Sequence, residues 1–315
     1  MNYYGLVDGS DASLRNFLRT LSGVDQIGAE SRAAMLATRS IKTTAKNWAI
    51  DLAISMVDLT TLEGADTPGK IRALAAKAVR PDPTDSTVPS VGAVCVYNDM
   101  VSIARQHLDL IGGAHVRVAA VSTAFPSGRA SMAVKIQDTQ DAIDAGAAEI
   151  DMVIDRGAFL SGRYLEVFNE IVQIRALCGK KTHLKVILET GELVTYDNVR
   201  KASFLAMLAG ADFIKTSTGK VSPAATPPVV LVMLEAVRDF YEMTDRRIGV
   251  KPAGGIRNTK DAIKQLVLVN ETAGPEWLNP GLFRIGASAL LNDLLMQRMK
   301  MRDGYYPSPT YVTID

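Results

Sequence analysis

Three lysines occur in or at the ends of short apolar runs, and their amines are the groups in this chain best suited to covalent chemistry. They are Lys185, Lys215 and Lys251, and two other runs hold the carboxylates of Asp58 and Asp151. A single lysine at the end of a strand is usually a charge on the rim, because lysine is almost never fully buried unless it is paired. Three lysines on consecutive expected strands, with carboxylates on two others, favour a functional site.

The chemistry that these groups support is imine formation with a carbonyl substrate. A neutral amine attacks a carbonyl carbon, whereas an ammonium group cannot, and an unperturbed lysine has a pKa of about 10.4. A second cation nearby and partial desolvation both favour the neutral amine. Lys215 and Lys251 are expected to affect each other in this way, and Asp151 is expected to balance the pair and to move protons.

Glycine-bearing segments follow three of the apolar runs and are suited to holding a phosphate. They contain Thr216, Gly219 and Lys220; Gly254 and Gly255; and Gly286 and Ser288. Glycine lets backbone N–H groups approach an anion, and a helix expected to begin at 288–289 adds a favourable dipole. A lone Gly-Gly pair is typical of a plain turn, but three such loops in adjacent positions indicate a phosphate site.

The alternation of short apolar runs with longer helical patterns predicts a (βα)8 TIM barrel. The strands are expected at 53–59, 91–97, 116–122, 149–154, 183–188, 212–216, 248–252 and 283–287. The helices are expected at 66–79, 98–112, 131–146, 160–177, 195–209, 223–242, 259–271 and 289–301. A doubly wound open sheet is the alternative, but it rarely needs eight repeats, and no GxGxxG follows the first run. Barrels of this class carry their catalytic groups at the C-terminal ends of the strands.

The direction of the charged side chains follows from the two-residue period of a strand. On the fifth run, apolar residues occupy positions 184, 186 and 188, so this face should pack under the helices. Lys185 is therefore expected to point into the barrel. The same alternation turns Asp151, Lys215 and Lys251 inward.

The chain is expected to divide into three parts. Residues 1–52 form a helical N-terminal extension, with helices at 11–21, 29–40 and 42–52 and with Asp11 as the first N-cap. Residues 53–303 form the barrel, and residues 304–315 form an irregular tail. The turn-rich segment 80–90 is expected to be a surface excursion.

Composition excludes several classes of protein. The 315 residues are 47% hydrophobic and 22% charged, which is typical of a globular protein. The net charge of +1 gives no field for holding nucleic acid or an anionic membrane surface. Cys95, Cys178 and the three histidines fit no disulfide framework or metal-ligand spacing. These features predict a cytoplasmic protein that acts without a metal.

Two segments of the chain resemble a known family. Asp212-Phe-Ile-Lys-Thr-Ser-Thr-Gly-Lys220 and Gly249-Val-Lys-Pro-Ala-Gly-Gly-Ile-Arg257 are similar to the two signature segments of the 2-deoxyribose-5-phosphate aldolases. Supporting matches lie in family order at 57–62, 93–97, 149–153, 184–193 and 283–288, so the resemblance covers about residues 52–300. The N-terminal helices and the long 80–90 segment look like the longer branch of that family.

The resemblance implies a role for each matched residue. Lys215 would be the Schiff-base lysine, Lys251 the second lysine that favours its neutral form, and Asp151 a proton relay. Asp58 and Lys185 would line the same site. The residues implied to hold the substrate and its phosphate are Thr216, Gly219, Lys220, Gly254, Gly255, Gly286 and Ser288.

The resemblance also implies a class I aldolase that converts 2-deoxy-D-ribose 5-phosphate to D-glyceraldehyde 3-phosphate and acetaldehyde. Such a reaction needs no metal or organic cofactor, because the lysine imine is the electron sink. The partner would be a small-molecule substrate, and a homo-oligomer is compatible with the resemblance. Two alternatives stay open: a Schiff-base aldolase for another phosphorylated sugar, and a silent barrel that only binds sugar phosphate. Simple binding does not need two apposed lysines, which argues against the silent barrel.

Overall fold

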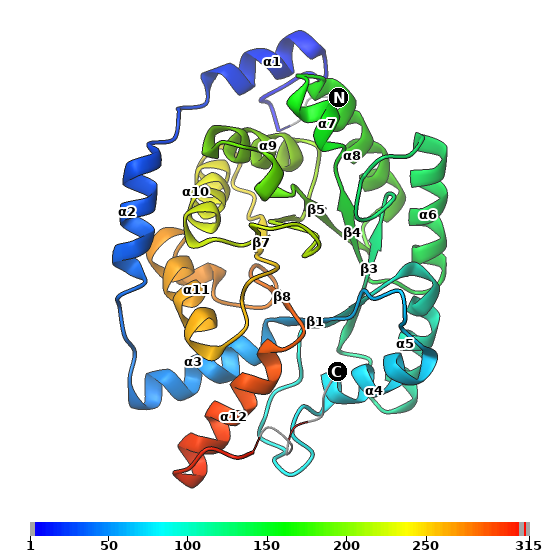
Figure 1. The fold of residues 1–315 in the computed structure, drawn as a ribbon. Helices are drawn as coiled ribbons and strands as arrows, with labels where there is room; N and C mark the ends of the chain where they lie inside the picture. The colour runs from blue at the N-terminus through cyan, green and yellow to red at the C-terminus, as the bar shows by residue number, and fades with distance from the viewer. Residues whose placement is uncertain (1–3, 309–311, 313–315) are drawn as a thin grey trace.

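Eight parallel strands form one sheet that curls round on itself in the computed structural model, which describes residues 4–308 and 312 (Figure 1). The strands are β1 (Val57–Thr60), β2 (Ala93–Val96), β3 (Arg117–Ser122), β4 (Glu149–Val153), β5 (His183–Ile187), β6 (Phe213–Lys215), β7 (Gly249–Lys251) and β8 (Ile285–Ala287). Their order is β7-β6-β5-β4-β3-β2-β1-β8. Backbone hydrogen bonds from Arg284 N to Val250 O (3.1 Å) and from Gly286 N to Pro252 O (2.9 Å) close the remaining gap. The predicted (βα)8 TIM barrel is confirmed.

Helices surround this barrel. They are α1 (Asp11–Thr20), α2 (Gln26–Leu36), α3 (Thr43–Ser55), α4 (Pro68–Val79), α5 (Val101–Leu110), α6 (Met132–Asp144), α7 (Arg156–Leu160), α8 (Tyr164–Cys178), α9 (Tyr196–Leu208), α10 (Pro227–Thr244), α11 (Thr259–Thr272) and α12 (Leu290–Asp303). Three short 3-10 helices are η1 (Asn98–Met100), η2 (Thr190–Glu192) and η3 (Pro275–Trp277). Within residues 4–308 and 312, no helix combines the length and the apolar character that crossing a membrane requires.

Some boundaries differ from those that the sequence predicts. The run at 53–59 begins as helix, because α3 continues to Ser55 and β1 starts at Val57. Short apolar runs fit a buried helix as well as a buried strand, so periodicity does not separate them. The helix expected at 160–177 is two helices, α7 and α8, because Gly162 between them has a positive φ of 76°.

The N-cap of α1 is Ser10 and not Asp11. The Ser10 hydroxyl accepts a hydrogen bond from Ser13 N at 3.2 Å. Asp11 is instead the first helical residue, where a carboxylate interacts favourably with the helix dipole.

Apolar packing lies mainly outside the sheet, between strands and helices. Leu184, Val186 and Leu188 belong to this outer core, as the alternation on the fifth run predicts. The smaller inner cluster contains Leu62, Cys95, Ala119 and Val121. The barrel interior therefore has room for polar groups.

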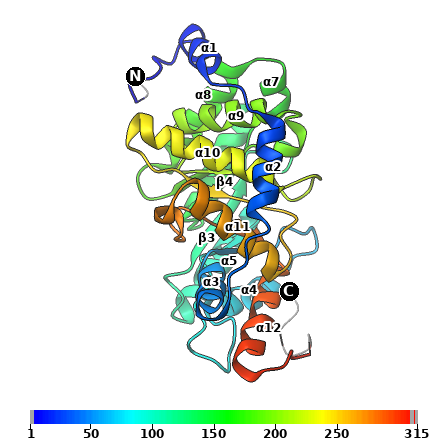
Figure 2. The same cartoon turned by 90° about the vertical axis from the view of Figure 1, so that its left-hand side faces the viewer.

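The first three helices run around the outside of one half of the barrel (Figures 1 and 2). Helix α1 packs on α8 and α9, α2 packs on α10 and α11, and α3 packs on α11 and α12. Arg298 of α12 pairs with Asp51 of α3 at 2.7 Å and with Asp85 at 2.5 Å. The turn-rich segment 80–90 is thus attached to α12, and residues 309–311 and 313–315 of the predicted tail lie outside the described residues.

Candidate active site

Charged side chains occupy the barrel interior, where most barrels of this class carry branched apolar residues. They come from β1, β4, β5, β6, β7 and the residue before β8, and every one is buried. They are Asp58, Glu149, Asp151, Lys185, Lys215, Lys251 and Arg284. A buried charge is costly unless it is paired, so the contacts among these groups decide what the site can do.

Asp151 lies at the centre of this cluster. Its Oδ2 is 2.8 Å from Lys215 Nζ and 2.7 Å from Lys251 Nζ, and its Oδ1 is 3.2 Å from Lys185 Nζ. Burial alone would raise the pKa of this carboxyl, but the three lysines hold it well below its usual value. Asp151 is therefore an anion that three amines share.

A second set of ion pairs lies next to Asp151. Asp58 pairs with Lys251 at 2.5 Å and with Arg284 at 2.6 Å. Glu149 pairs with Arg284 at 3.2 Å and with Lys185. Lys185 and Lys251 therefore contact two carboxylates or more.

These contacts keep two of the three lysines charged. Burial would lower the pKa of Lys185 and of Lys251, but Asp151 and the further carboxylates raise both. The pKa of Lys251 rises well above its ordinary value. Among the described residues, Asp151 is the only carboxylate that Lys215 contacts.

A cavity of about 450 Å³ opens at the C-terminal ends of β1, β6, β7 and β8. Lys215 borders it, whereas Lys185 and Lys251 are not among its lining residues. The predicted phosphate residues border the same cavity: Gly219, Lys220, Gly254, Gly255, Gly286 and Ser288. The structure thus brings Lys215 and three glycine loops together.

Two of these glycines leave no room for a side chain. Gly254 has a φ of 80°, and a Cβ there would lie 2.7 Å from the Cβ of Ala224. A Cβ on Gly286 would lie 2.9 Å from the Cβ of Ala253. Bare backbone at both positions lets an anion approach the main-chain N–H groups.

Besides Asp151 and Lys251, three more predicted site residues do not line this cavity: Thr216, Asp58 and Lys185. The Thr216 hydroxyl accepts a hydrogen bond from Ala253 N at 2.9 Å and donates one to Ala253 O at 3.2 Å, so it connects the ends of β6 and β7. Asp58 and Lys185 lie within the ion-pair network. Asp58 contacts Lys251, and Lys185 contacts Asp151.

Sequence reasoning assigned no role to Glu149, Glu189 or Arg284. Glu149 lies two residues before Asp151, and Arg284 lies two before Gly286, so alternation could have placed both inside the barrel. Glu189 is buried, and its carboxylate accepts a hydrogen bond from the Thr218 hydroxyl at 2.5 Å. Burial raises the pKa of Glu189, and this contact fixes the loop after β6.

The known proteins that this chain resembles are aldolases. Residues 52–295 match the model of the family described as DeoC/LacD family aldolase. The chain is 47% identical over 253 residues to a human protein named deoxyribose-phosphate aldolase, covering 78% of this chain and 79% of the human one.

Solved structures show the same fold. A putative deoxyribose-phosphate aldolase from Coccidioides immitis is 30% identical with a TM-score of 0.65, covering 86% of this chain and 98% of that one. A deoxyribose phosphate aldolase from Aeropyrum pernix, described as a tetramer, is 22% identical with a TM-score of 0.62 and covers 82% and 99%. At that identity the second likeness concerns the fold alone.

The buried carboxylates predict that stability depends on pH on the acid side. The pKa values of Asp58 and Asp151 are lowered from 3.8, so their stabilising contribution is present above that pH and is lost as pH falls below it. The free energy of unfolding of Asp58→Asn should change less steeply with pH between about 5 and 3 than that of the wild type. It should also lose about 3–5 kcal/mol near pH 7, because Lys251 and Arg284 lose a partner.

Urea denaturation at a series of pH values measures both effects. The control is Asp99→Asn, which neutralises an exposed carboxylate. If the free energy of unfolding changed equally steeply with pH in Asp58→Asn and in the wild type, this account of the network would be contradicted.

Proposed function

The chain belongs to the DeoC/LacD family of aldolases, and we propose that it reversibly cleaves 2-deoxy-D-ribose 5-phosphate to D-glyceraldehyde 3-phosphate and acetaldehyde. It is a carbon–carbon lyase that acts on a small molecule. One observation carries the choice of substrate: Lys215 and the glycine loops after β6, β7 and β8 border one cavity. An amine for the carbonyl end and a cradle for the phosphate end are therefore within reach of the same substrate.

The proposed reaction proceeds through an imine on Lys215. The neutral amine attacks C1 of the open-chain sugar, and loss of water gives a protonated imine. This cation withdraws the electron pair of the C2–C3 bond when the C3 hydroxyl loses its proton, which releases D-glyceraldehyde 3-phosphate and leaves an enamine. Protonation at C2 and hydrolysis then release acetaldehyde. Asp151, whose Oδ2 is 2.8 Å from Lys215 Nζ, is the proposed carrier of these protons.

The charge balance of the interior explains why Lys215 is the proposed nucleophile. The cluster contains four basic groups, Lys185, Lys215, Lys251 and Arg284, and three carboxylates, Asp58, Glu149 and Asp151. Full ionisation would leave one buried cation without a matching anion. Within residues 4–308 and 312, Lys215 contacts one carboxylate and shares it with two other lysines, so it is the group whose charge is least compensated.

The expectations about cofactor, cellular compartment and oligomeric state are also proposals. The imine supplies the electron sink, so the reaction as proposed uses no metal or organic cofactor. Both cysteines are buried and unpaired, which supports a reducing compartment such as the cytoplasm. A homo-oligomer stays a prediction. An assay with acetaldehyde as donor and with product identification separates this activity from an aldolase for another sugar phosphate.

Lys215 is expected to be the only residue that forms an imine. Treatment with acetaldehyde and borohydride should leave an ethyl group on Lys215, located by peptide mass spectrometry. Lys215→Ala should lose at least about 10³-fold in turnover, because the covalent path is removed. An ethyl group on Lys185 or Lys251 would assign the nucleophile elsewhere, and an absence of trapping would support the silent barrel.

Lys251 is expected to act through its charge. Lys251→Leu removes a cation and leaves Asp58 and Asp151 free to favour the ammonium form of Lys215. The acid limb of the pH profile of kcat/KM should therefore move to higher pH by roughly one unit or more. Lys251→Arg keeps the charge and is the matched control, with a limb near that of wild type. If the acid limb of Lys251→Leu lay at the same pH as that of the wild type, Lys251 would not act through its charge.

Ser288 is expected to lie beside the substrate phosphate. Ser288→Glu puts a negative charge at that place, and like charges repel strongly in a confined site. The loss of kcat/KM should be at least about tenfold larger for deoxyribose 5-phosphate than for deoxyribose. Ser288→Gln, similar in size but neutral, is the control. Equal losses on the two substrates would show that Ser288 does not serve the phosphate.

A further inference from the structure

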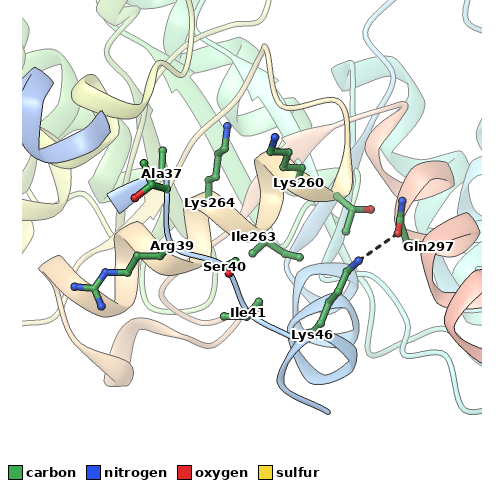
Figure 3. A pocket seen from close by; sticks show the side chains of 11 residues that line it. Ala37, Arg39, Ser40, Ile41, Lys46, Lys260, Ile263, Lys264 and Gln297 are labelled. Carbon is green, nitrogen blue, oxygen red and sulfur yellow. Dashed lines mark hydrogen bonds between the residues drawn. The ribbon is translucent and has the colours of Figure 1, made fainter. Parts of the chain in front are cut away.

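A second cavity, of about 440 Å³, lies on the outside of the barrel between the segment joining α2 to α3, helix α11 and helix α12 (Figure 3). Lys46 of α3, Lys260 and Lys264 of α11 and Gln297 of α12 border it. In Figure 3 the side chains of Lys260 and Lys264 extend from α11 toward the top of the view, and that of Lys46 extends from α3 toward Gln297. None of these residues belongs to the candidate active site, so this cavity needs its own explanation.

The cavity concentrates positive charge without a matching anion. Its 11 lining residues include no aspartate or glutamate. Lys46 contacts the amide of Gln297 at 3.5 Å, and among the described residues none of the three lysines forms an ion pair. The remaining cation, Arg39, is paired with Glu271 at 3.3 Å.

The arrangement on α11 costs stability when the cavity is empty. Lys260 and Lys264 are four residues apart on one helix, and like charges at that spacing destabilise a helix. Lys264 is half-buried, so solvent screens the repulsion only in part. An anion bound between these side chains would remove the repulsion and gain charge-assisted hydrogen bonds.

The remaining walls suit an apolar group. Ala37, Ile41 and Ile263 border the cavity and are half-buried, which leaves apolar surface that a ligand could cover. The volume lies within the range of roughly 300–1,000 Å³ that is usual for small-molecule sites. Three lysines match the charge of a diphosphate, since a terminal phosphate carries roughly two negative charges and the inner phosphate adds one.

We propose that this cavity binds a nucleoside diphosphate, with the diphosphate among Lys46, Lys260 and Lys264 and the nucleoside against Ile41 and Ile263. The site is separate from the aldolase cavity and does not depend on the substrate proposed for it. The two cavities are close along the chain, because Arg257 borders one and Thr259 borders the other. The experiment must therefore distinguish them.

Isothermal titration of the full chain with ADP tests the proposal. Lys260→Gln/Lys264→Gln should weaken ADP binding at least about tenfold, because two charged contacts are lost. Lys46→Gln, on a different helix, should weaken it by about fivefold. The matched control is Lys180→Gln/Lys181→Gln, which removes two exposed lysines elsewhere and should leave the affinity within about twofold. Aldolase activity of the α11 variant should stay near wild type, which verifies its fold.

Two further titrations identify the ligand and the cavity. Pyrophosphate should bind at least about fivefold more weakly than ADP, since it leaves the apolar wall uncovered. Ser288→Glu, with a negative charge in the aldolase cavity, should bind ADP as wild type does. Equal affinity for pyrophosphate and ADP, loss of ADP binding in Ser288→Glu, or unchanged binding in Lys260→Gln/Lys264→Gln would each overturn the proposal.

Discussion

The contact of one carboxylate with three lysines is the interaction on which the candidate active site depends. Asp151 accepts from Lys185, Lys215 and Lys251, and each of those amines would be costly to bury without it. Lys185 and Lys251 contact further carboxylates, whereas Lys215 contacts no other among the residues that the structure describes. The same anion therefore holds two lysines whose pKa values are raised, Lys185 and Lys251, and it is the one carboxylate that Lys215 contacts in the part of the chain that the structure describes.

The register of the strands sets how far along the barrel axis each of these groups lies. Asp151 is paired with Lys185 across β4 and β5, and Lys215 is paired with Lys251 across β6 and β7. Ile187, two residues beyond Lys185, is the partner of Lys215, so the second pair lies nearer the mouth of the barrel. A slip of one residue in β6 would turn Lys215 toward the helices. The apolar outer face of each strand prevents such a slip, and it therefore also keeps the lysines pointing into the barrel.

The sequence predicts the directions of the side chains better than their partners. The alternation of β5 is enough to turn Lys185 inward, and the order of the strands is enough to bring Lys215 close to Lys251. It does not reveal that Arg284 joins Asp58 to Glu149, because those contacts link residues far apart in the chain and depend on closure of β8 onto β1. The sequence also assigns Thr216 to the substrate, whereas its hydroxyl is hydrogen-bonded to the backbone of Ala253 and connects the ends of β6 and β7.

Because charged groups occupy the barrel interior, the apolar packing that stabilises the fold lies mainly outside the sheet. The inner apolar cluster is small, whereas the outer core includes residues of every strand and of the N-terminal helices. Helices α1 to α3 pack on α8 to α12, and these are the helices that flank β5 to β8. Those strands and the residue before β8 carry all four buried cations of the network. The N-terminal extension therefore covers the half of the barrel in which mutual repulsion is greatest, and apolar burial there offsets the cost of holding the lysines together.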